Sequence, residues 1–194
     1  MNKEKMTTEP SPDSYNERNG FKSNLYERTS SGITEYAYVT AGTQDITDIR
    51  QDALQLIGYS SQYKESVDNA IMLNRQYANS ELTFVGHSLG GGLAAANALA
   101  TDRNAITFNP AAITNKTKRN LHLPATISKG RIFNVVIQGE IINFIQSKCG
   151  LNMEGNCFTF KAPYLPWNSF INTFRRFKNH SIDTIIQMIE EELK

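Results

Sequence analysis

The stretch ELTFVGHSLGGGLAAANALA, residues 81–100, combines a strand-like run, a glycine-rich turn and a helix-like run. Its first part, Glu81–Gly86, is a short apolar run that predicts a buried strand. Its last part, Leu89–Ala100, consists of small and aliphatic residues and predicts a helix packed closely on a sheet. The junction Gly86-His87-Ser88-Leu89-Gly90 fits the pattern G-x-S-x-G, in which a sharp strand-to-helix turn presents a serine hydroxyl. Glycine is expected at both ends of this pattern because side chains there would collide with the neighbouring strand and helix. Ser88 is therefore the candidate nucleophile.

Strand-like and helix-like segments alternate on both sides of this stretch. Further strands are predicted at Thr34–Thr40, Asn104–Phe108 and Arg131–Gln138, which are rich in β-branched and aromatic residues. Further helices are predicted at Asp45–Ile57, Ser61–Tyr77 and Ile182–Leu193, where apolar residues recur at helical spacing and Ser181 caps the last one. This alternation predicts a three-layer α/β architecture with a compact, mostly parallel central sheet covered on both faces. Such sheets carry their sites beyond the carboxyl ends of the strands.

Length and composition indicate an ordinary globular protein. The 194 residues, 40% hydrophobic and 20% charged, suit a single domain over 15–194 after a polar, flexible tail over 1–14. The net charge of +1 gives no basic field that would favour nucleic acid as a partner. The beginning of the chain lacks the apolar core of a signal peptide, so we expect synthesis in the cytoplasm, with export only by a specialised route.

The two cysteines and three histidines do not indicate a metal site. Cys149 and Cys157 are close enough in sequence for one loop-closing bridge, and two reduced cysteines fit the spacing equally well. We therefore expect chemistry that requires neither a metal nor an organic cofactor.

An activated serine needs a base, which follows the acid in the chain order of this kind of site. Only His122 and His180 follow Ser88 in the sequence. His180 is late in the chain, in a loop before the last helix, and is the predicted base. His87, beside the serine within the elbow, is expected to point away from it.

Three carboxylates lie between the serine and the predicted base: Asp102, Glu140 and Glu154. Asp102 is expected at the opposite edge of the sheet, because it precedes a strand. Glu140 follows the strand predicted at Arg131–Gln138 by two residues and is the predicted acid. Glu154 is the reserve candidate, and Asp183 is a further one outside the usual chain order.

The oxyanion hole of such a site needs two N–H groups directed at the developing negative charge. The residue after the nucleophile, Leu89, is expected to supply one. The loop after Thr34–Thr40 is expected to supply the other, from Thr43, whose hydroxyl could also contribute.

The segments around these residues resemble the class 3 lipases, including bacterial phospholipase-like effectors. TFVGHSLGG (Thr83–Gly91) resembles the elbow of that family, and YAYVTAGTQDITDIRQD (Tyr36–Asp52) resembles the family's strand and following acidic helix start. Ala41 stands where the family usually has arginine, and Glu140 stands where it usually has aspartate. The resemblance implies an α/β-hydrolase-type fold, with Ser88, Glu140 and His180 as triad and Thr43 with Leu89 at the oxyanion hole.

An aromatic segment, Phe158–Phe177, precedes the predicted base. Phe170, Phe174 and Phe177 fall on one helical face beside cationic residues, as suits an acyl pocket or a surface on anionic lipid. An amphipathic core helix explains the pattern equally well, and the family resemblance favours the lipid interpretation.

We therefore expect a serine hydrolase that cleaves lipid esters, with lipase or phospholipase A activity and peripheral membrane contact. Three alternatives stay open. The first is a secreted antibacterial-type effector with the same chemistry and a cognate immunity protein as partner. The second is a non-catalytic α/β binding module. The third is an acyltransferase, because an acyl-enzyme does not determine its acceptor.

Overall fold

The structure is a computed structural model. It describes residues 15–16, 19–42, 60–127, 130–148, 150–162, 176 and 178–193. The expected tail over 1–14 and the helix expected at Asp45–Ile57 lie outside these residues.

The described residues form a seven-stranded sheet whose strands lie in sequence order. The strands are β1 (Tyr15–Asn16), β2 (Phe21–Ser30), β3 (Ile33–Thr40), β4 (Glu81–His87), β5 (Asn104–Phe108), β6 (Ile132–Ile137) and β7 (Asn156–Phe160). β1, β2 and β3 pair antiparallel, whereas β3 to β7 are all parallel. The carboxyl ends of five parallel strands therefore meet at one edge, where the site was expected.

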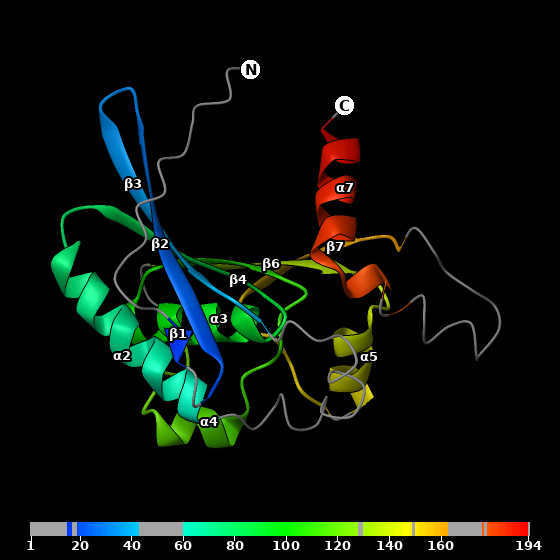
Figure 1. Ribbon diagram of the computed structural model, residues 1–194. Coiled ribbons are helices and arrows are strands. Elements are labelled where there is room, and N and C mark those ends of the chain that lie inside the picture. Colours follow the sequence, from blue (N-terminus) through cyan, green and yellow to red (C-terminus); the bar gives the residue numbers. More distant parts are fainter. Residues whose placement is uncertain are drawn as a thin grey trace.

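Helices cover both faces of this sheet (Figure 1). They are α2 (Ser60–Gln76), α3 (Leu89–Thr101), α4 (Asn115–Asn120), α5 (Ile141–Lys148) and α7 (Ile182–Glu192). α2 and α3 pack on one face, where Phe84 and Leu93 are fully buried in the main core. α7 packs on the other face through Ile185, against Phe108 and Val135. The expected α/β-hydrolase-type architecture with a mostly parallel sheet is confirmed.

The apolar residues expected at helical spacing over Ile182–Leu193 are only partly buried. Ile185 is buried in α7, but Ile186 and Leu193 of the expected apolar face are 48% and 80% exposed. The C-terminal end of α7 extends away from the sheet (Figure 1). Phe158 belongs to the edge strand β7 and is 56% exposed. Phe170, Phe174 and Phe177 lie outside the residues whose side chains the structure describes.

None of the helices in the described part of the chain is long and apolar enough to span a membrane. Cys157 has a free, exposed thiol, and Cys149 lies outside the described residues.

Candidate active site

Ser88 occupies the turn between β4 and α3 with a strained backbone, φ 59° and ψ −126°. A non-glycine residue rarely adopts such angles unless its surroundings impose them. Here Ser88 N–H donates to the Phe108 carbonyl at 3.0 Å, and Ala111 N–H donates to the Ser88 carbonyl at 2.9 Å. The serine is also 2% exposed. The turn is therefore held by β5 and the loop that follows it.

The glycines of this turn are required by close packing. A Cβ on Gly86 would lie far inside van der Waals contact with the carbonyl of Gly90, at the start of α3. A Cβ on Gly90 would collide in the same way with the main chain of Thr40 at the end of β3. Thr40 also holds the start of α3 in place, because its Oγ1 donates a hydrogen bond to the Gly90 carbonyl at 2.7 Å. The expected reason for these glycines is confirmed.

His180 lies in contact with the serine, although 92 positions separate them in the chain. Its Nε2 is 2.9 Å from Ser88 Oγ, within the range of a hydrogen bond. His180 is only 2% exposed. A surface histidine that merely precedes a helix would not be buried at this edge of the sheet. The cap of α7 is instead Ser181, whose hydroxyl accepts from Asp183 N–H at 3.2 Å.

Glu140 lies on the other side of the same imidazole. Its Oε2 is 2.6 Å from His180 Nδ1, and the carboxylate is 1% exposed. Glu140 directly precedes α5, so its oxygens also accept from the N–H groups of Ile142, at 2.8 Å, and Asn143. A helix N-terminus favours negative charge. The buried carboxylate thus has donors on both oxygens, and Nδ1 must carry the proton that it donates to Glu140.

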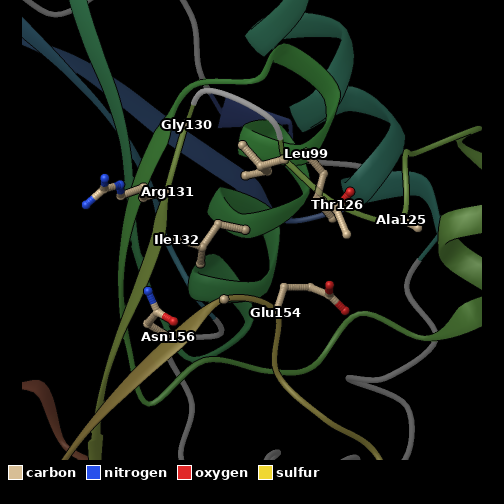
Figure 2. A pocket seen from close by; sticks show the side chains of 10 residues that line it. Leu99, Ala125, Thr126, Gly130, Arg131, Ile132, Glu154 and Asn156 are labelled. Carbon is tan, nitrogen blue, oxygen red and sulfur yellow. The ribbon is translucent and has the colours of Figure 1, made fainter.

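The other carboxylates considered from the sequence lie elsewhere. Glu154 forms a partly buried ion pair with Lys118. It lines a pocket of about 250 Å³ near the beginnings of β6 and β7, the opposite edge of these strands (Figure 2). Asp183 is exposed in the first turn of α7, and Asp102 follows α3 at that opposite edge. His122, the other histidine considered as base, is exposed.

Of the two residues expected at the oxyanion hole, the structure describes Leu89. Leu89 is the first residue of α3 and is buried beside the serine. As such, its N–H has no acceptor within the helix. Gly42 lies against the elbow, because a Cβ there would be 2.7 Å from the His87 carbonyl and 3.3 Å from Ser88 Cβ. The loop after β3 therefore reaches the serine as far as it is described, and Thr43 lies outside the described residues.

Three residues make contacts around the site that were not predicted. His87 packs its ring on that of His180 at a centroid distance of 4.8 Å. Burial and the nearby His180 lower the pKa of His87 to about 4. Asn109 directly follows β5, and Arg176 Nη1 donates to the Gly139 carbonyl at 2.6 Å. The position of Asn109 after a parallel strand was an available signal. The sequence carries no signal for the contacts of His87 and Arg176.

The known proteins that this chain resembles are named as a phospholipase and as lipases. The extracellular phospholipase A1 of Serratia liquefaciens is 36% identical over 111 residues, which are 57% of this chain and 33% of that protein. A triacylglycerol lipase from Penicillium expansum matches with a TM-score of 0.52 and 17% identity, over 81% of this chain and 70% of that one. A Rhizomucor miehei lipase propeptide complex gives 0.50 and 16%, over 72% and 52%. The chain thus spans about a third of the Serratia protein and about half of the Rhizomucor chain.

The sheet order, the elbow and the structural matches define an α/β-hydrolase-type protein with the fold of lipases. More particularly, the chain belongs to the Tle-like phospholipase domain family, whose family model matches residues 2–162.

Proposed function

We propose that this chain hydrolyses a carboxylic ester of a phospholipid, with Ser88 as nucleophile, His180 as base and Glu140 as acid. One observation carries the proposal. The serine hydroxyl, imidazole and carboxylate form a continuous hydrogen-bonded chain, with distances of 2.9 and 2.6 Å. All three side chains are buried at the edge of the sheet where this fold places its chemistry.

In this mechanism His180 Nε2 accepts the hydroxyl proton of Ser88 while Oγ attacks the ester carbonyl. The imidazolium that forms is stabilised by Glu140, which also holds the ring in the productive tautomer. The N–H of Leu89 and a donor from Thr43 stabilise the oxyanion. When the tetrahedral intermediate collapses, His180 gives its proton to the departing alcohol and the acyl group stays on Ser88. Water then attacks the acyl-enzyme with His180 as base, which releases the fatty acid and restores the serine.

The substrate class rests on family membership and on the Serratia relative, which is named as a phospholipase A1. A phospholipase of the A type cleaves an acyl ester, and the acyl-enzyme chemistry of Ser88 suits this bond. Cleavage on the phosphate side would need no acyl-enzyme. We therefore assign the acyl ester as the bond cut.

The description of that relative as extracellular also supports export of this chain and contact with a membrane surface. We further propose that the chain acts as a secreted effector and that a cognate immunity protein is its partner. It is tested by co-purification of the wild-type protein with the product of a neighbouring gene.

The experiment is release of fatty acid from phosphatidylcholine and phosphatidylethanolamine vesicles, followed by mass spectrometry of the products. Ser88→Ala is compared with Ser66→Ala, a matched change at a buried serine that bonds only within the α2–α3 packing. We expect fatty acid and lysophospholipid from wild type and Ser66→Ala. Loss of Ser88 should lower kcat roughly 10³-fold or more.

Full release by Ser88→Ala would overturn the proposal. Failure of wild type to react with a serine-directed fluorophosphonate would instead favour a non-catalytic binding module. Transfer of the acyl group to an added alcohol in place of water would identify an acyltransferase.

A further inference from the structure

Asn109 connects three parts of the site through one buried side chain. It is 1% exposed and directly follows β5. Its Oδ1 accepts from Ile137 N–H at 2.9 Å, at the end of β6 and three residues before the proposed acid. Its Nδ2 donates to the main-chain carbonyl of Asn179 at 3.1 Å and lies 3.5 Å from that of His180. The segment of the base is thus attached to the strand that leads to the acid.

The backbone of Asn109 suits this role. Its φ of 42° lies in the left-handed region, which asparagine tolerates better than most residues. Its own N–H donates to the Val135 carbonyl at 2.8 Å, which fixes the main chain on β6. The amide orientation is determined by its neighbours, because Oδ1 faces an N–H group and Nδ2 faces two carbonyl groups. An aspartate of the same shape would place a negative oxygen against those carbonyls.

His87 is a second donor to the same main chain. Its Nε2 lies 2.7 Å from the carbonyl oxygen of His180, and since a carbonyl only accepts, Nε2 carries the proton. His87 is the neighbour of Ser88 at the end of β4. The main chain of the base therefore contacts the strand ends that carry the proposed nucleophile and acid.

We infer that Asn109 is a positioning residue that, together with His87, holds His180 in reacting geometry through the main-chain carbonyls of Asn179 and His180. This inference rests on the proposed function. A displacement of about 1 Å in such a group can cost on the order of 100-fold in rate. Among the described residues Asn109 forms no hydrogen bond with Ser88 or Glu140, and it acts through the backbone carbonyls of Asn179 and His180.

The test is Asn109→Asp, with Asn134→Asp as the matched control. Asn134 is another asparagine of 1% exposure, whose Nδ2 donates to the carbonyls of Glu154 and Asn156, away from the site. Both variants place a carboxylate against two main-chain carbonyls, so both should lower Tm. With a soluble p-nitrophenyl ester, we expect Asn109→Asp to lower kcat roughly 10- to 100-fold, with KM within about twofold. Asn134→Asp should keep kcat within about threefold of wild type. Equal losses of kcat in the two variants would overturn the inference.

A second readout does not depend on activity. The proton that His180 shares with Glu140 should give a far-downfield signal in the proton NMR spectrum of the wild-type protein. We expect this signal to shift or broaden in Asn109→Asp and to remain in Asn134→Asp. If wild type cleaves no ester but the signal behaves in this way, the proposed function fails and the positioning role stands. If Asn109→Asp does not fold, His87→Phe keeps the ring and removes the donor, and it should change the signal and kcat in the same direction. An unchanged signal and kcat in His87→Phe would overturn the inference.

Discussion

The carboxylate of Glu140 accepts a hydrogen bond from His180 Nδ1 at 2.6 Å while it also caps the N-terminus of α5. One side chain thus connects the imidazole to a helix that packs beneath it. The buried carboxylate is thus held both by main-chain N–H groups of α5 and by the imidazole of His180. The geometry of the proposed acid therefore depends on α5.

Glu140→Gln should keep the shape of the side chain but remove the negative charge. A glutamine has one oxygen for the α5 N–H groups and directs its NH₂ group at His180 Nδ1, which favours the wrong tautomer. We expect kcat to fall by roughly 10³- to 10⁴-fold, as measured with a soluble p-nitrophenyl ester. Glu154→Gln removes the other candidate carboxylate, which is paired with Lys118, and should leave kcat within about threefold. If Glu154→Gln proves the more damaging change, the assignment of the acid is wrong.

The stability of the protein should depend on pH through His87. Its pKa is lowered in the folded state to about 4 from an ordinary 6.5, so the unfolded chain binds more protons between these values. The corresponding stability is fully present above pH 6.5 and is lost as pH falls towards 4. We expect a loss of about 2–3 kcal/mol between pH 7 and 4.5, measured by urea unfolding. His87→Phe should remove this part of the pH dependence, whereas His122→Gln, at an exposed histidine, should retain it. Identical pH profiles for wild type and His87→Phe would contradict the assignment.

The elbow should not tolerate a methyl group at Gly86. The added Cβ would meet the carbonyl of Gly90, which cannot move without displacing α3. We expect Gly86→Ala to lower the free energy of unfolding by about 3 kcal/mol or more, or to prevent folding. Gly32→Asn is the control, because that turn glycine has φ +79° but open space around it. Asparagine accepts this conformation, so the cost should stay near or below about 1 kcal/mol. A folded Gly86→Ala of wild-type stability would show that the elbow packs less tightly.

Arg176 should hold the segment of the base against the loop of the acid. Its guanidinium donates to the Gly139 carbonyl and lies 4.1 Å from the centre of the Phe144 ring on α5. Arg176→Met keeps much of the apolar contact and loses the donor. We expect kcat to fall about 3- to 10-fold and Tm to fall by a few degrees. Lys148→Met removes the more distant cation, 5.8 Å from the same ring, and should change neither by a comparable amount. If the two variants change kcat and Tm equally, Arg176 contributes only through its packing on Phe144, and its hydrogen bond to Gly139 has no role.

The amino-acid order alone was sufficient to predict the strand, turn and helix around Ser88, because this signal is local. β3, β4, β5 and β6 begin and end within one residue of the predicted strands. Chain order and the position of residues after strands also selected Glu140 and His180, which lie in contact with each other and with Ser88, and whose roles in catalysis remain predictions. The short helix α5 and the edge strand β7 were missed because neither has a long apolar period. The oxyanion residue Thr43 and the aromatic face of Phe170 and Phe174 remain predictions.

The contacts that hold the base depended on three-dimensional packing. Asn109 and His87 bind carbonyls 70 and 93 positions away in the chain, and no periodicity of the sequence reports such a pairing. The second contact of Glu140 also appeared only in the structure, where its carboxylate accepts from the N–H groups of Ile142 and Asn143 at the start of α5. Hydrophobic spacing records which face of an element is buried. Which side chains meet at the ends of parallel strands is determined only when the strands take their order in the sheet.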